Sequence, residues 1–160
     1  MGTDLEPPRS AREAGTTPWH LRLAPADAGP AAGLGGVVAA EAAQVGEGKL
    51  AVLVPPGRAE ELAELIRSEV PAATARQGPA VLDARVAVLT VAEAKGLEFD
   101  AVVVTDPAAI LATGSHGGND LYVALTRATA RLGVVHPGEL PRVLARLAAK
   151  SVVMRARDRR

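Results

Sequence analysis

Hydrophobic residues occur in short continuous runs, separated by longer segments in which apolar and polar positions alternate with helical spacing. Continuous aliphatic runs of this length are typical of strands that are buried on both faces of a sheet. The runs that we interpret as strands are 49–54, 86–90, 101–105 and 132–135, with a weaker candidate at 19–23. The segments that we interpret as helices are 30–46, 58–70, 119–130 and 140–149.

This alternation of strands and helices predicts the fold class. Aliphatic strands with helices between them indicate an α/β domain, an open and mostly parallel sheet with helices on both faces. Sheets of this kind bind their ligands at the carboxyl ends of the strands. We therefore expect any site to be formed by polar residues beside strand ends.

Composition sets limits on the domain and its location. The 160 residues are 48% hydrophobic, which suits one domain over 19–150. Residues 1–18 are rich in proline, glycine and charge and predict a linker, whereas 151–160 form a basic tail. There is no cysteine, which excludes disulfides and thiolate metal sites, and no apolar run reaches the roughly 18 residues of a membrane span. We expect a cytoplasmic protein that does not contact a membrane.

Several self-sufficient sites are absent from the sequence. There is no G-x-x-x-x-G-K-[ST] phosphate loop. The stretch 33–36, Gly-Leu-Gly-Gly, lacks the third glycine of a dinucleotide loop, and a loose helix start explains it better. His20, His116 and His136 are scattered without the spacing of metal ligands, so we predict no metal site.

One stretch before a strand combines residues that suit a nucleotide. Lys95 supplies a positive charge, and Gly96 allows backbone N–H groups to approach an anion closely. Glu98 can accept hydrogen bonds from sugar hydroxyls. Taken alone, this stretch is better explained by a tight turn with both charged side chains in solvent.

A second stretch, YVALTRA at 122–128, places Arg127 on a predicted helix beside a strand carboxyl end. The planar guanidinium of an arginine matches phosphate oxygens, and its charge offsets the charge that develops during γ-phosphate transfer. Arg127 is therefore a candidate catalytic arginine finger. The alternative is an ordinary surface arginine.

Together these stretches resemble two motifs of superfamily 1 helicases of the UvrD/Rep/PcrA type. TVAEAKGLEFD at 90–100 is similar to their motif V, and YVALTRA at 122–128 is similar to motif VI, in the same order and with similar spacing. In the detail of its sequence, the segment 86–141 is most similar to the helicase IV/HelD-like branch of this superfamily.

The resemblance implies a RecA-like domain that closes over ATP bound to a second, N-terminal RecA-like domain. It implies that Lys95 and Gly96 line the γ-phosphate, that Glu98 contacts the ribose, that Arg127 is the finger, and that Thr90 lies on the nucleic-acid track. It also implies that Mg²⁺ is held by the N-terminal domain and that the partner is DNA, in its single-stranded form. Because the P-loop must come from elsewhere, we expect no ATP hydrolysis by this chain alone.

Two alternatives stay open at this point. The first is a HelD-like ATPase that remodels RNA polymerase, which Ala92 favours, because UvrD-like proteins usually have histidine at that position. The second is an adaptor whose nucleotide site has decayed. The presence of Lys95, Gly96, Glu98 and Arg127 argues against decay.

Overall fold

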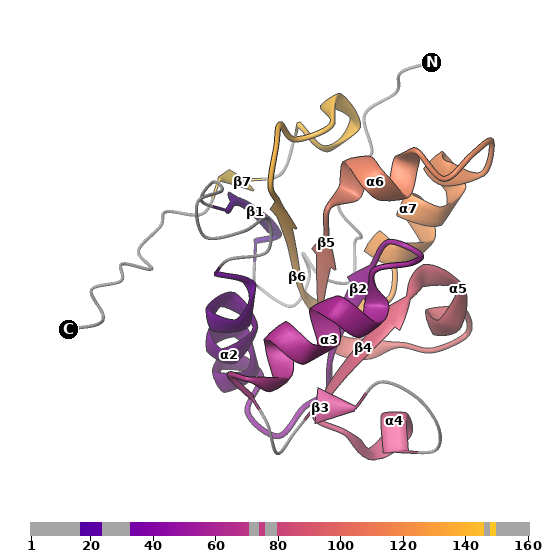
Figure 1. Ribbon diagram of the computed structural model, residues 1–160. Coiled ribbons are helices and arrows are strands. Elements are labelled where there is room, and N and C mark those ends of the chain that lie inside the picture. The colour runs from indigo at the N-terminus through magenta and orange to yellow at the C-terminus, as the bar shows by residue number, and fades with distance from the viewer. Residues whose placement is uncertain (1–16, 24–32, 71–73, 76–79, 146–147, 150–160) are drawn as a thin grey trace.

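The protein forms a seven-stranded sheet with helices on both faces (Figure 1), as seen in a computed structural model that describes residues 17–23, 33–70, 74–75, 80–145 and 148–149. The strands are β1 (Trp19–Arg22), β2 (Leu50–Val54), β3 (Thr74–Ala75), β4 (Val86–Thr90), β5 (Phe99–Thr105), β6 (Ala128–His136) and β7 (Ala148–Ala149). Their order is β3-β4-β2-β5-β6-β1-β7, and every described pair is parallel. The α/β fold class predicted from the sequence is confirmed.

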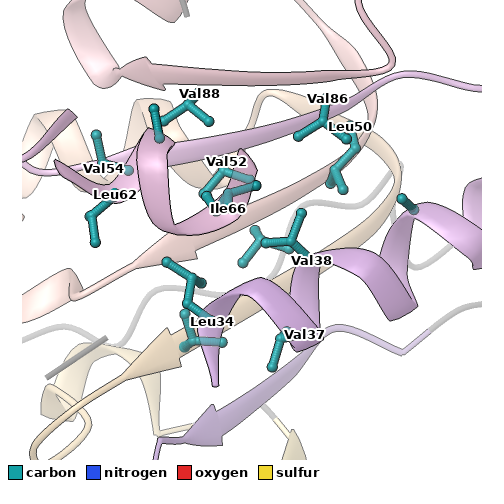
Figure 2. Packing of buried hydrophobic residues seen from close by; sticks show 14 of the residues in the cluster. Leu34, Val37, Val38, Leu50, Val52, Val54, Leu62, Ile66, Val86 and Val88 are labelled. Carbon is teal, nitrogen blue, oxygen red and sulfur yellow. The ribbon is translucent and has the colours of Figure 1, made fainter. Parts of the chain in front are cut away.

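The helices cover the two faces unequally. They are α2 (Leu34–Val45), α3 (Ala59–Arg67), α4 (Ala80–Asp83), α5 (Val91–Ala94), α6 (Pro107–Leu111), α7 (Gly117–Leu125) and the 3-10 turn η2 (Arg142–Leu144). One apolar core lies between the sheet and α2 and α3, and the other lies between the sheet and α5, α6 and α7. Figure 2 shows part of the first core, where the side chains of Val52 and Ile66 pack together.

The aliphatic runs became the central strands because each has apolar side chains for both cores. All five residues of β2 are buried, and alternate residues belong to opposite cores. Burial of apolar side chains on both faces is the expected position of a central parallel strand. The five predicted strands and the helices predicted at 30–46 and 58–70 are present, the latter two as α2 and α3.

The predicted helix 119–130 is wrong in its second half. Helix α7 ends at Leu125, and residues 128–130 belong to β6 instead. Alanine-rich sequence favours helix, but Ala128 pairs with Phe99, and this tertiary pairing overrides the local preference.

The predicted closing helix 140–149 is also wrong. The described part of that segment contains η2 and the two-residue strand β7, which pairs with Trp19 and His20 of β1. A strand edge has unpaired backbone groups, and covering β1 with β7 satisfies some of them. The short elements β3, α4, α5 and α6 were missed because each has too few residues to show a period. Of the predicted linker 1–18 the structure describes only residues 17 and 18, and the predicted tail 151–160 lies outside the described residues.

An irregularity in the sheet lies between β5 and β6. Phe99 pairs with Ala128, but Ala101 pairs with Arg131, so β6 advances by three residues where β5 advances by two. Such a β-bulge is rare between parallel strands, and bulges are common next to functional sites. The bulge begins one residue after Arg127.

Candidate functional site

The two candidate stretches meet at the amino edge of the sheet. Residues 95–98 directly precede β5 and Arg127 directly precedes β6, and the two strands begin with the pair Phe99–Ala128. The carboxyl edge is the opposite edge of the sheet, where Thr90 ends β4 and pairs with Val54, the last residue of β2. The expectation that Arg127 lies on a helix beside a strand carboxyl end is therefore wrong. It follows α7 and precedes the amino end of β6.

Gly96 is explained by a type II β-turn. Lys95 has φ −60° and ψ 134°, Gly96 has φ 83°, and the N–H of Leu97 donates to the carbonyl of Ala94 at 3.0 Å. The third position of a type II turn requires positive φ, which glycine adopts without strain. A Cβ atom at Gly96 would meet no other atom within 4 Å, so the turn needs the backbone conformation and not the space.

The turn does not offer a continuous nest of backbone donors. The N–H groups of Lys95 and Leu97 already donate to the carbonyls of Ala92 and Ala94, at 3.4 and 3.0 Å. An anion here would be bound by side chains and by single backbone N–H groups such as that of Gly96, not by a run of successive ones. Lys95 and Glu98 are both exposed, and within the described residues neither side chain has a hydrogen bond or an ion pair. Both are therefore available to a ligand.

Arg127 is held between α7 and the turn. Its Nε donates to the carbonyl of Val123 at 3.2 Å and its Nη1 to the carbonyl of Leu97 at 3.1 Å. Its Nη2 lies 3.5 Å from the Thr126 hydroxyl. No carboxylate of the described residues pairs with this half-buried cation. A guanidinium has five N–H donors, so Arg127 retains charge and donors for an anion.

Thr90 lies at the opposite edge in a capping box at the start of α5. Its hydroxyl accepts the N–H of Glu93 at 3.3 Å, and its own N–H donates to Glu93 Oε1 at 2.9 Å. The hydroxyl hydrogen of Thr90 remains a donor. Thr90 and Arg127 therefore lie at opposite edges of the sheet.

The carboxyl edge has features that were not predicted from the sequence. Asp106 is the one described non-glycine residue with positive φ (52°), and its carboxylate accepts the N–H of Ala109. Beside it lies a hollow, lined by Leu23, Leu34, Arg58, Leu62, Thr105, Asp106, Val135 and Pro137. Arg58 forms two hydrogen bonds, both 3.0 Å, with Glu61, which raise its pKa. The dipeptide Asp-Pro after a strand was the available signal for this cap.

A histidine pair lies at the same edge. Nδ1 of His20 is 3.0 Å from Nε2 of His136, and Nδ1 of His136 is 2.7 Å from the carbonyl of Gly138. These residues are scattered in the sequence, and only the pairing of β1 with β6 brings them together. Over the residues that the structure describes, no group of three or more His, Asp or Glu side chains could hold a metal ion, and no helix could span a membrane.

Comparison with known proteins gives one family and several related folds. Residues 85–135 match the UvrD-like helicase C-terminal domain family, and this range contains both candidate stretches. No curated protein matches the chain. The structure is similar to the C-terminal domain of a possible DNA helicase from Lactobacillus plantarum WCFS1, with TM-score 0.63 and 22% identity over 84% of this chain and 85% of that one.

A more distant similarity is to the SWI2/SNF2 ATPase core of Sulfolobus solfataricus in complex with double-stranded DNA. The TM-score is 0.54 and the identity 13%, over 81% of this chain but only 31% of the other. At this identity the similarity concerns the fold. The fold agrees with a RecA-like domain of a helicase.

Proposed function

We propose that this domain is the C-terminal, ATP-closing and translocating half of a superfamily 1 DNA helicase. In this proposal the P-loop belongs to an N-terminal RecA-like domain, and the present domain completes the nucleotide site from outside. The match of 85–135 to the UvrD-like C-terminal family supports it, as does the fold shared with a helicase C-terminal domain.

The observation that carries the proposal is the convergence of the two stretches. The guanidinium of Arg127 contacts the carbonyl of Leu97, 30 positions away in the sequence, and Leu97 lies between Gly96 and Glu98. The two stretches therefore present an arginine, a lysine and a carboxylate at one edge. An ordinary surface arginine would have no reason to be tied to that turn.

The chemistry assigned to each residue follows from its groups. Arg127 would place its remaining donors on the γ-phosphate, where negative charge increases in the transition state. Lys95 would contribute a second positive charge, and Gly96 would keep the turn in its type II conformation. Glu98 would accept hydrogen bonds from the ribose hydroxyls. Bound ATP with Mg²⁺ would supply the phosphoryl group, and Mg²⁺ would be held by the N-terminal domain.

Thr90 would act on a different ligand. Its hydroxyl hydrogen is a donor at the carboxyl edge, which suits a phosphate oxygen of a single DNA strand. Because Thr90 and Arg127 lie at opposite edges of one sheet, a movement of this domain over ATP would move the strand contact as well. This is how the domain would convert closure into translocation.

A second candidate is a HelD-like motor that remodels RNA polymerase. One observation favours it: between Thr90 and Lys95 the exposed residues are Ala92 and Glu93, so this loop offers no cation or aromatic ring to a DNA strand. Unwinding of a tailed duplex by the complete protein would support the helicase. Retention of RNA polymerase on the immobilised complete protein, without unwinding, would support the second candidate.

The test is ATP turnover by the complete protein, which contains the P-loop domain, with saturating single strand. Arg127→Ala should lower turnover on the order of a thousandfold, because a finger acts mainly on the transition state. Arg67→Ala is the matched control, since Arg67 pairs with Glu64 on the surface of α3. If Arg127→Ala turned over ATP as fast as the control Arg67→Ala, the proposal would be contradicted. The chain alone should show no turnover above background, because it has no P-loop.

A further inference from the structure

Thr129 has a contact that the proposed site does not explain. Its side chain is exposed, so it contributes little to either core, yet its hydroxyl donates to the carbonyl of Phe99 at 3.2 Å. The same Phe99 donates its N–H to the carbonyl of Arg127 at 2.9 Å. Phe99 is thus bound on both sides by the residues that flank Ala128.

This contact lies where the sheet is irregular. The bulge adds one residue to β6 between the pairs Phe99–Ala128 and Ala101–Arg131. A bulge disrupts the ladder locally and changes the direction of nearby side chains. The pairing that fixes the start of β6 is therefore short, and it directly follows Arg127.

Three of the hydrogen bonds that connect the two stretches across this short pairing bear on the position of Arg127. They are Arg127 Nη1 to the Leu97 carbonyl, Phe99 N–H to the Arg127 carbonyl, and the Thr129 hydroxyl to the Phe99 carbonyl. The first is made by the finger itself, so it would change if the Arg127 side chain moved toward a phosphate. The second belongs to the backbone. The third is donated by the Thr129 side chain. It therefore stays in place when the Arg127 side chain moves.

We infer that Thr129 is a positioning residue for Arg127: its hydroxyl fixes the start of β6 against Phe99, and so sets the distance between Arg127 and Glu98. The inference rests on the proposed function. Threonine suits the role because its β-branched side chain has few rotamers and holds the hydroxyl in place. Glu98 and Arg127 would contact opposite ends of the nucleotide, so an error in their spacing would affect the transition state more than binding.

The experiment compares variants of the complete protein by steady-state ATP turnover, KM for ATP and thermal midpoint. Thr129→Val keeps the shape and removes the donor, and it should lower kcat about tenfold with KM within about twofold, as expected for a misplaced catalytic group. Thr129→Ser keeps the hydroxyl and should retain turnover within about twofold of the wild type. The matched control is Thr113→Val, which removes a hydroxyl bond to the carbonyl of Ile110 far from Arg127.

The outcomes separate this inference from the proposed function. Thr129→Val turnover equal to that of Thr113→Val, with Arg127→Ala inactive, would overturn the role of Thr129 and leave the proposed function standing. Loss of turnover in Thr129→Ser equal to that in Thr129→Val would overturn it too, because the hydroxyl would not be the cause. If the thermal midpoint of Thr129→Val were well below that of Thr113→Val, the loss of ATP turnover would be explained by lower stability. That result would overturn the inference. An active Arg127→Ala would overturn both proposals.

Discussion

The two edges of the sheet differ in how their polar side chains are used. At the carboxyl edge three polar groups are satisfied within the domain: Arg58 pairs with Glu61, Thr90 is in a capping box, and His20 is bonded to His136. The side chain of Arg22, exposed at the end of β1, has no hydrogen bond or ion pair within the described residues. At the amino edge Arg127 is bonded only to neutral oxygens of the described residues, and the Lys95 side chain has no such partner. Charges that lack a partner within the described domain are the ones available to another molecule.

This difference bears on how such a domain is used. An open α/β domain that binds its own ligand does so at the carboxyl edge, where the loops and helix N-termini gather. A domain that completes a site on another domain can present side chains from the amino edge instead. Asp106 and the hollow beside it lie at the carboxyl edge, and the bulge beside Arg127 lies at the amino edge.

The largest expected effect contrasts one arginine at each edge. Arg127→Lys keeps the charge and loses the planar fork, so ATP turnover of the complete protein should fall on the order of a thousandfold, about 4 kcal/mol of barrier. Arg58→Lys makes the same chemical change at the carboxyl edge, where the fork contacts Glu61. Arg58→Lys should keep turnover within about twofold of the wild type, since the pair of Arg58 and Glu61 is on the surface.

Steady-state assays of ATP turnover, with saturating single-stranded DNA, measure both lysine variants. A large loss in Arg58→Lys with normal turnover in Arg127→Lys would reverse the assignment of the two edges.

The positions of Lys95 and Glu98 could be predicted from the sequence, and that of Arg127 could not. Residues 95–98 stand before a predicted strand, and in a parallel sheet the residues before every strand lie at its amino edge. The place of Lys95 and Glu98 therefore followed from the strand prediction alone. Arg127 did not, because 126–130 is compatible with helix by composition, and only the pairing of Ala128 with Phe99 makes it strand.

Long-range contacts were the part that hydrophobic periodicity could not predict. The central strands were predictable because their aliphatic residues face two cores at once. The bond from Arg127 to Leu97 joins residues 30 positions apart, and the histidine pair joins residues 116 positions apart. No local pattern encodes such contacts.

The second contrast concerns two glycines with positive φ. Gly96 has φ 83° and Gly57 has φ 88°, and a Cβ atom added at either position would have no other atom within 4 Å. Alanine at either site therefore meets only backbone strain, and each substitution should lower the free energy of unfolding by about 1–2 kcal/mol. Urea unfolding of the two variants measures this cost.

ATP turnover should distinguish the two glycines, because only Gly96 shapes the turn that carries Lys95 and Glu98. Turnover by the complete protein should fall in Gly96→Ala and stay near that of the wild type in Gly57→Ala. Equal turnover in both variants would show that the type II turn is only structural.

A smaller effect is expected from the capping box at Thr90. Thr90→Ala removes the acceptor for the N–H of Glu93 and should lower the free energy of unfolding by about 1 kcal/mol. Thr90→Ser keeps the acceptor and should be close to the wild type. Chemical denaturation of the chain itself measures both, and a Thr90→Ser variant as unstable as Thr90→Ala would rule out the hydroxyl as the source of the stabilisation.

The smallest expected effect is a dependence of stability on pH at the carboxyl edge. The Gly138 carbonyl can only accept, so His136 carries its proton on Nδ1, and its Nε2 accepts from Nδ1 of His20. Nε2 of His20 has no hydrogen-bond partner within the described residues and can take up an added proton. Burial, and then the proximity of His136, lower the pKa of His20 from its ordinary value of 6.5.

The sign of the effect follows from that shift. The unfolded chain takes up a proton at His20 near pH 6.5, whereas the folded protein does so only at lower pH. The contribution to stability is therefore fully present above pH 6.5 and is lost as the pH falls through the pKa of the folded state. Thermal midpoints of the chain should decrease from about pH 7.5 to about pH 5.5, and His20→Gln should make that decrease smaller. His116→Gln is the control, because His116 is exposed and its side chain has no partner among the described residues. If the two variants had equal slopes, the histidine pair would not be the origin of the pH dependence.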